Sequence, residues 1–175
     1  ELERDLIPLI IEMRRRGIRV NERRAEQTAE QLEIRRDTVV EELRRMTGHR
    51  SLEFDHLNSP RHLASLFDAE NISYPRTAKT GQPSFQKEWL ESHEHWLPKA
   101  VVQARQLNDY ANKFVRNYIL GSTHLGRVHA EVHQLRDGKH GTRSYRFAYS
   151  SPPLQQIPGR DPELSPLIRG IFEPH

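Results

Sequence analysis

A short segment near the C-terminal end carries side chains that could contact a nucleic acid. It reads RSYRFAYSSPPLQQIPGR (143–160) and combines spaced arginines with two consecutive glutamines and two consecutive prolines. Arginine and glutamine are long hydrogen-bond donors that reach the minor-groove acceptors of DNA, which every Watson–Crick pair presents in nearly the same place. Prolines between them restrict the backbone and preorganise these donors. The segment therefore predicts contact with paired DNA of any sequence.

The composition favours a helical protein with a locally basic surface. Hydrophobic residues make up 35% of the chain and charged residues 29%, so we expect a thin core and an elongated shape. The formal net charge is only +3, but basic residues outnumber acidic ones over 136–169, where a polyanion could bind. The absence of cysteine excludes disulfides and thiolate metal sites. No apolar run approaches the roughly 20 residues of a membrane span, so we expect no membrane partner.

Four segments show the spacing of apolar residues that is typical of amphipathic helices. We expect these helices over 5–17, over 22–46, from Pro60 onward and over 98–120. Asp5, Asn21 and Ser59 are natural N-caps, and Pro8 would then fall in a first turn, where it is tolerated. Gly17 can end the first helix.

Two of these helices have well-defined apolar faces that predict where the core lies. The face of the second helix consists of Ala25, Ala29, Leu32, Val39, Leu43 and Met46. The face of the fourth helix consists of Ala100, Ala104, Leu107, Ala111, Phe114 and Tyr118.

After residue 126 the pattern changes from helical to extended. Val128, Ala130 and Val132 alternate with polar residues, as in a half-buried strand. A turn at Asp137-Gly138 leads to a second alternating segment, 142–147, and the prolines beyond it exclude a regular helix. The expected fold class is therefore mainly α with a small antiparallel β portion. The expected regions are a helical one, 1–125, and the beginning of a sheet-containing one, 126–175.

Three features that could carry chemistry also have ordinary explanations. The ten histidines match no common metal-ligand spacing, and exposed polar histidines are the favoured interpretation. The charged helix 22–46 could pair as a coiled coil, but a solvated helical face is favoured. The loop YPRTAKTGQPSF (74–85) offers amides, hydroxyls and cations to a phosphate strand. An ordinary surface loop would look the same, so both interpretations of this loop stay open.

Several segments resemble, in chain order, the motifs of family A DNA polymerases, which are the bacterial polymerase I type and its phage relatives. They are LIPLIIEMRRRGIRVN (6–21), LNSPRHLASLF (57–67), TAKTGQPSF (77–85), GRVHAEVHQ (126–134), GTRSYRFAYSSPPLQQIPGR (141–160) and IRGIFEP (168–174). Each motif is weak alone, whereas their common order is specific. The resemblance implies an elongated helical thumb, 1–125, followed by the first strands of a polymerase palm, 126–175.

The resemblance also implies which side chains contact DNA. Arg146 would meet the primer-end base pair in the minor groove, Gln155 and Gln156 would meet the primer–template near the insertion site, and Arg160 would lie close to the active site. The implied phosphate contacts in the thumb are Asn58, Ser59, Arg61, Thr80, Gly81 and Ser84, with Lys113 and Arg116 on the long helix that follows.

Three residues depart from the family pattern. Tyr145 stands where the family has glycine, Pro153 where it usually has asparagine, and Phe85 where threonine is common. These departures bear on the local backbone and on one base contact.

The carboxylates that hold the catalytic metal ions in such enzymes have no counterpart here. The family places its first metal-binding aspartate beyond the segment that resembles IRGIFEP. We therefore expect no catalytic residue and no metal ligand in this chain, with Mg²⁺ and deoxynucleoside triphosphates bound by the assembled enzyme. A second polypeptide or segment would carry the rest of the palm and the fingers. The chain would be one subunit of a split polymerase or a fragment of a longer one, in the cytoplasm of a bacterial or phage-infected cell.

Without that second segment, apolar side chains in the first part of the palm should have no packing partners. The apolar residues expected to be stranded are Leu154, Ile157, Leu167, Ile168, Ile171 and Phe172. Two alternatives to a polymerase part are a stand-alone, non-catalytic nucleic-acid-binding module and a helical protein-interaction scaffold. Salt-insensitive or absent DNA binding would favour the scaffold.

Overall fold

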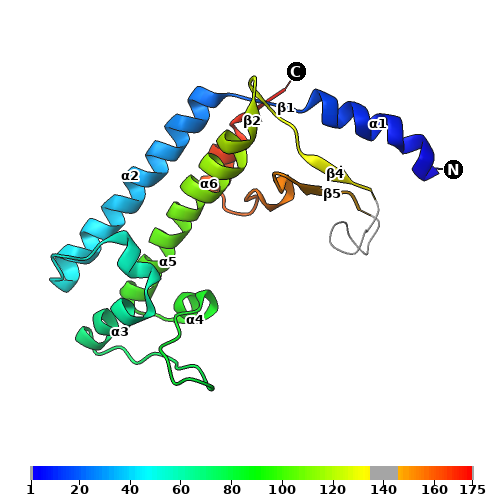
Figure 1. Cartoon of the computed structure of the whole chain (residues 1–175). Helices are drawn as coiled ribbons and strands as arrows, with labels where there is room; N and C mark the ends of the chain where they lie inside the picture. The colour runs from blue at the N-terminus through cyan, green and yellow to red at the C-terminus, as the bar shows by residue number, and fades with distance from the viewer. Residues whose placement is uncertain (1, 135–145, 175) are drawn as a thin grey trace. The chain divides into compact units, whose positions relative to one another are not determined.

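The computed structural model describes residues 2–134 and 146–174 (Figure 1). The fold is mainly α with a small antiparallel β portion, which confirms the predicted class. Contacts divide the chain into two compact units: a first unit of Glu1–Glu30 with Tyr110–His175, and a second unit of Gln31–Asp109. The first unit combines both ends of the chain, whereas the predicted regions 1–125 and 126–175 are consecutive. The assignment of those regions to thumb and palm stays a prediction.

The six short strands found among the described residues all lie in the first unit, together with the helices around them. Its elements are α1 (Leu2–Arg16), β1 (Ile18–Val20), the start of α2 (Glu22–Thr47), nearly all of the π-helix η2 (Asp109–Ile119), η3 (Leu120–Ser122), β2 (Thr123–His124), β3 (Arg127–Val128), β4 (Glu131–His133), β5 (Ala148–Ser150), η4 (Leu154–Gln156), α6 (Leu164–Arg169) and β6 (Phe172–Glu173).

The second unit is helical. Its elements are the remainder of α2, the 3₁₀ helix η1 (Phe54–Asn58), α3 (Pro60–Ala69), α4 (Lys87–Ser92) and α5 (Trp96–Asn108). The sequence did not predict α4. No helix in the described parts of the chain is both long and apolar enough to cross a membrane.

Helix α1 ends as predicted but begins earlier. Gly17 has φ +63°, and its amide donates to the Met13 carbonyl, which closes the helix. At the other end the helix starts at Leu2, so the prediction of an Asp5 cap was wrong and Pro8 lies inside the helix. The residues before Asp5 are compatible with a helix and continue it toward the N-terminus.

Helix α2 begins at the predicted cap. The amide of Arg24 donates to Oδ1 of Asn21 at 2.9 Å, which satisfies one of the first-turn donors. The predicted face is buried at Ala25, Ala29, Leu32, Val39 and Leu43. Met46 was predicted wrongly, since it is 53% exposed in the last turn of the helix, where the apolar stripe leaves the core.

The central element of the main sheet is a strand that the sequence did not predict. The sheet has the order β2-β3-β1-β6 with antiparallel pairing, and β1 pairs Ile18 with Val128 and Val20 with Phe172. A three-residue strand is too short for its alternation to stand out beside two long helices.

This sheet overturns part of the prediction about uncovered apolar residues. Ile168 and Ile171 are fully buried, because β6 has a partner in β1 and α6 packs within the first unit. Leu154, Ile157, Leu167 and Phe172 are half-buried.

The predicted strand over 127–133 divides into two. Its alternation is confirmed, because Val128, Ala130 and Val132 are buried. However, β3 joins the main sheet, and β4 pairs with β5 in a separate sheet, with Val132 opposite Tyr149. The predicted turn at Asp137-Gly138 and most of the predicted strand 142–147 lie outside the described residues, and pairing in β5 begins at Ala148.

The predicted helix over 98–120 is part α-helix and part π-helix. The α-helix α5 continues directly into the π-helix η2, a form that is rare and that periodicity does not reveal. Of the predicted face, Ala104, Leu107, Ala111 and Phe114 are buried, whereas Ala100 and Tyr118 are half-buried.

Candidate nucleic-acid interface

The N-terminus of α3 presents the first group of predicted phosphate contacts. Ser59 occupies the N-cap position and Pro60 the first turn, as predicted. The Ser59 hydroxyl makes no capping bond with the first-turn amides. Asn58 and Arg61 are exposed beside it. Amides and a guanidinium at a helix N-terminus favour an anionic partner.

The loop between α3 and α4 presents the second group, and it is ordered by its own hydrogen bonds. Thr77 and Thr80 share a hydroxyl hydrogen bond of 2.6 Å, and the Thr77 amide donates to the Gln82 carbonyl at 2.8 Å. Nη1 of Arg76 donates to the Gly81 carbonyl at 3.1 Å. Gly81 has φ +65° and open space around its α-carbon, so the backbone conformation is what requires glycine. Thr80 and Gly81 are therefore presented at the surface in a fixed loop.

Aromatic side chains at both ends of this loop pack together and anchor it. The Phe85 ring lies 4.9 Å from the Phe67 ring and 4.9 Å from the Tyr74 ring, and 6.2 Å from that of Trp89. Phe85 is 8% exposed. Phenylalanine in place of the threonine that is common in the family therefore has a structural role, because its ring fills this cluster.

Arg105 of α5 connects the two groups. Its Nε and Nη2 donate to the Leu57 carbonyl at 2.9 and 2.6 Å, and its Nη1 donates to the Phe85 carbonyl at 3.2 Å. Burial of the guanidinium lowers the pKa of Arg105, and the nearby carboxylate of Asp109 partly opposes this effect. The sequence analysis did not identify Arg105, because its position beside the buried face of α5 does not reveal its acceptors at Leu57 and Phe85.

The π-helix η2 carries Lys113 and Arg116. The wider turns of a π-helix bring together residues four and five apart. Tyr110, Phe114 and Tyr118 accordingly form a row, with ring centroids 5.8 and 5.7 Å apart. The Lys113 ammonium lies 5.3 Å from the Phe114 ring centroid and 5.9 Å from that of Tyr118, which holds this exposed cation in place.

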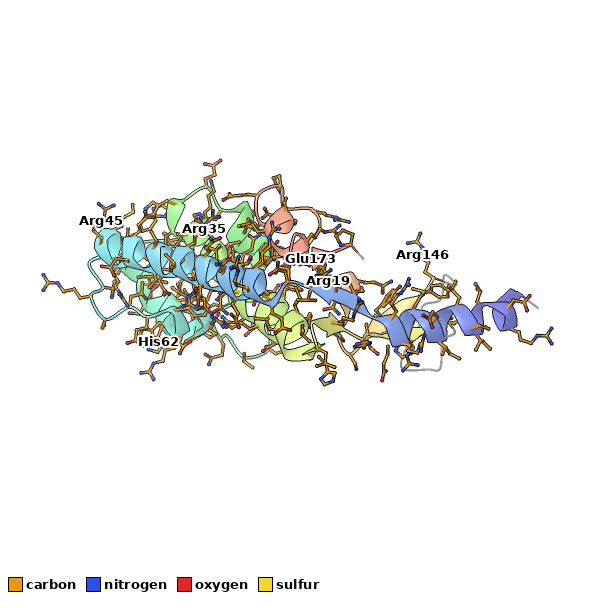
Figure 2. All side chains as sticks on the ribbon, turned by 90° about the horizontal axis from the view of Figure 1, so that it is seen from above. Arg19, Arg35, Arg45, His62, Arg146 and Glu173 are labelled. Atoms are coloured by element: carbon orange, nitrogen blue, oxygen red, sulfur yellow. The ribbon has the colours of Figure 1, made fainter. Side chains whose placement is uncertain are left out.

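The predicted minor-groove residues lie around β5 and η4. Arg146 is exposed and projects away from the ribbon (Figure 2). The Gln155 amide instead turns to the protein, because its Nε2 donates to the Phe147 carbonyl at 2.6 Å. Gln156 and Arg160 are exposed.

The sequence comparison identifies the family. The family model of DNA polymerase family A matches residues 22–175. The chain belongs to DNA polymerase family A. It is 35% identical to a DNA polymerase DpoZ of Acinetobacter phage SH-Ab 15497, over 99% of this chain and 30% of that protein. It is also 30% identical to a DNA-directed DNA polymerase of Pseudomonas phage M6, over 99% of this chain and 26% of that protein. The chain thus spans about 30% of the length of these relatives.

Comparison with solved structures agrees on the fold. The POL domain of Pol1 from M. smegmatis, solved in complex with DNA primer-template and dNTP, matches 93% of this chain and 28% of that chain. The TM-score is 0.71, and the sequences are 24% identical. Two thirds or more of each of these family A proteins lies outside the part that this chain matches.

The structure of this family A chain brings together some of the predicted contacts. In the second unit, Arg105 donates hydrogen bonds to the backbone beside both groups of predicted contacts, those at the α3 N-terminus and those in the 77–84 loop. In the first unit, Gln155 bonds to the residue that follows Arg146. Lys113 and Arg116 lie on a separate element of the first unit. Among the described residues, no group of three or more histidine, cysteine, aspartate or glutamate side chains could hold a metal ion.

Proposed function

We propose that this chain is the thumb and the first palm strands of a family A DNA polymerase, where it binds and positions primer–template DNA. The observation that carries this proposal is a pair of segments in the second unit, the α3 N-terminus and the 77–84 loop, which present exposed donors such as Arg61 and Thr80. Arg105 bonds to the backbone beside both segments. Their donors suit phosphates, which carry no sequence information. The names of the phage relatives support a polymerase.

The first unit would add further contacts with the primer–template DNA. We assign to Arg146, Gln156 and Arg160 contacts in the minor groove and near the insertion site, because they are exposed donors in the segment that resembles the family motif. Gln155 would act on the backbone beside Arg146 in the free chain and on DNA only after its amide turns. In this assignment residues 1–125 are the thumb and residues 126–175 the start of the palm.

The chemistry would belong to a second segment that carries the rest of the palm and the fingers. Two-metal phosphoryl transfer needs carboxylates that hold the ions, and the motif resemblance implies that these lie beyond the segment that resembles IRGIFEP, so the metal ions and the deoxynucleoside triphosphate would bind in that second segment. We place its docking surface on this chain at a depression of about 320 Å³ lined by Ile18, Leu154, Ile157, Arg169 and Phe172. Strand β6 lies at the edge of its sheet and could accept a further strand. The assembled enzyme would work in the cytoplasm of a bacterial or phage-infected cell.

A salt titration of DNA binding tests the proposal. We expect the chain to bind a labelled primer–template duplex with little sequence preference and with an affinity that falls steeply as salt rises. The measurement is fluorescence anisotropy at several salt concentrations, with two duplexes of unrelated sequence. Affinity that is independent of salt, or that strongly favours one duplex, would rule out a phosphate-based grip.

One observation favours a second candidate function, a stand-alone nucleic-acid-binding module. The C-terminal segment is better supported within this chain than the polymerase assignment requires, since Ile168 and Ile171 are fully buried and β6 pairs with β1. Both candidates predict DNA binding. Only the polymerase assignment predicts that a segment with the remaining palm and fingers binds this chain and restores synthesis.

A further inference from the structure

Arg105 joins the two chain segments that carry the proposed phosphate contacts of the second unit. The Leu57 carbonyl, which accepts two of its hydrogen bonds, directly precedes Asn58 and Ser59. The Phe85 carbonyl, which accepts the third, directly follows Ser84. Figure 1 shows α4 beside the start of α5, and the loop that leads into α4 extends away from both. One guanidinium therefore reaches the backbone of both contact segments.

The chemistry of arginine suits this role in a way that lysine does not. A guanidinium is a planar fork with five N–H donors in fixed directions, so it can bond two carbonyls and set the distance between them. A lysine ammonium is a single point on a flexible stem. The two acceptors are themselves well anchored, because Leu57 is fully buried and Phe85 packs in the aromatic cluster. The Arg105 bonds thus fix the orientation of peptide groups whose neighbours face the surface.

We propose that Arg105 is a positioning residue, which holds the α3 N-terminus and the 77–84 loop at the spacing required for simultaneous contact with one DNA duplex. The inference rests on the proposed function, because it assumes that both segments bind phosphates. Arg105 acts through these segments and not by touching DNA. Losing the tie should therefore weaken binding although no phosphate contact is deleted, because two contacts gain from acting together only when their spacing is fixed.

Two substitutions at one position test this role. Arg105→Lys keeps the positive charge and loses the fork, whereas Arg105→Gln loses both. We expect each variant to bind the labelled primer–template duplex about tenfold more weakly than the wild-type chain, with the losses in the two variants similar. The salt dependence of Arg105→Lys should stay within about half a unit of the wild-type slope, since no phosphate contact is removed. Both are measured by anisotropy on chains shown to be folded by circular dichroism.

Arg44 supplies the matched control in the same unit. Its Nε donates to the Leu52 carbonyl, and Leu52 adjoins neither contact segment. Arg44→Lys should therefore lower the melting temperature to an extent comparable with Arg105→Lys, with DNA affinity changed less than about twofold. This comparison separates a general loss of stability from a loss of positioning.

Four outcomes would overturn the inference. Full affinity in Arg105→Lys with a loss only in Arg105→Gln would make Arg105 a direct phosphate contact. Unchanged affinity in both folded variants would leave Arg105 with a role in stability alone. Equal losses in Arg105→Lys and Arg44→Lys would remove any special role of the tie. Failure of the wild-type chain itself to bind DNA would refute the proposed function and this inference with it. If Arg105→Gln does not fold, the comparison of the two lysine variants decides.

Discussion

Asn21 and Glu173 are 152 positions apart in the sequence, and their side chains form a hydrogen bond. Nδ2 of Asn21 donates to Oε1 of Glu173 at 2.7 Å, while Oδ1 of Asn21 caps α2 by accepting from the Arg24 amide. Arg19 adds an ion pair to Glu173 at 3.2 Å, and Figure 2 shows the two side chains side by side. One asparagine thus links the start of the long helix to the last strand of the main sheet.

We expect Asn21→Ala to destabilise the chain through both of these bonds. Loss of an N-cap costs about 1–2 kcal/mol, and the part-buried bond to Glu173 adds roughly 1 kcal/mol. The free energy of unfolding, measured by urea denaturation, should therefore fall by about 2 kcal/mol. Glu173→Gln is the control, because it keeps an acceptor for Asn21 and loses only the exposed ion pair, so it should cost under about 1 kcal/mol. Equal losses in the two variants would mean that the cap contributes nothing.

Gly81→Ala should weaken DNA binding through the shape of the loop. Gly81 has φ +65° with open space around it, so alanine would be strained by its backbone conformation and not by a clash. Gly48 is a matched control, since it has φ +72°, also lies in open space, and ends α2 away from the contact segments. Each substitution should cost about 1 kcal/mol of stability. Only Gly81→Ala should raise the dissociation constant for duplex DNA, and a similar rise in Gly48→Ala would contradict the role of the loop.

The sequence predicted those features of the fold that depend on local chemistry. Asn21 caps α2, Gly17 closes α1 and Pro60 opens α3 because each acts on its own few neighbours. Strand β1 was missed, because only its pairing with β3 and β6, distant in sequence, makes it a strand.

The candidate interface was predictable to the same extent. The exposed donors around Ser59 and Thr80 belong to short motifs of consecutive residues, which the sequence alone reveals. The role of Arg105 was not predictable, because its acceptors at Leu57 and Phe85 lie 48 and 20 positions away and are brought together only by folding. The π-helical form of η2 was hidden for a related reason, since residues four apart repeat in an α-helix as well.

Arg61→Ala and Arg146→Ala should separate binding from positioning of the reacting end. Arg61, at the α3 N-terminus, is proposed to contact a phosphate, so its loss should weaken DNA binding and reduce the salt slope by about one unit. Arg146 is proposed to contact the terminal base pair, so its loss should lower the extension rate of bound DNA by up to about 100-fold with little change in affinity. Binding is measured by anisotropy and extension by single-turnover kinetics with the completed enzyme.

The contrasting explanation for Arg146 is a structural pairing with the acid Glu131 on β4. Glu131 accepts a hydrogen bond from Oγ of Ser150 at 3.2 Å and lies 3.9 Å from Nε2 of His133. Glu131→Gln is therefore the control for Arg146→Ala. If the two variants lose rate and affinity in the same proportion, Arg146 has no separate role at the primer end.

The isolated chain should incorporate no nucleotide at any Mg²⁺ concentration, and activity should appear when a polypeptide with the remaining palm and fingers is added. The reason is that two-metal phosphoryl transfer needs carboxylates to hold the ions, and the motif resemblance implies that these lie beyond the segment that resembles IRGIFEP. The two polypeptides should copurify through the apolar depression around Ile157.

Ile157→Asp should abolish copurification and synthesis together, because a buried, unpaired carboxylate is costly. Ile34→Asp, at a position that is 66% exposed on α2, is the matched control and should leave both unchanged. Metal-dependent synthesis by the chain alone would refute the division of roles, and a stable chain that binds DNA but that no such polypeptide complements would support the stand-alone module.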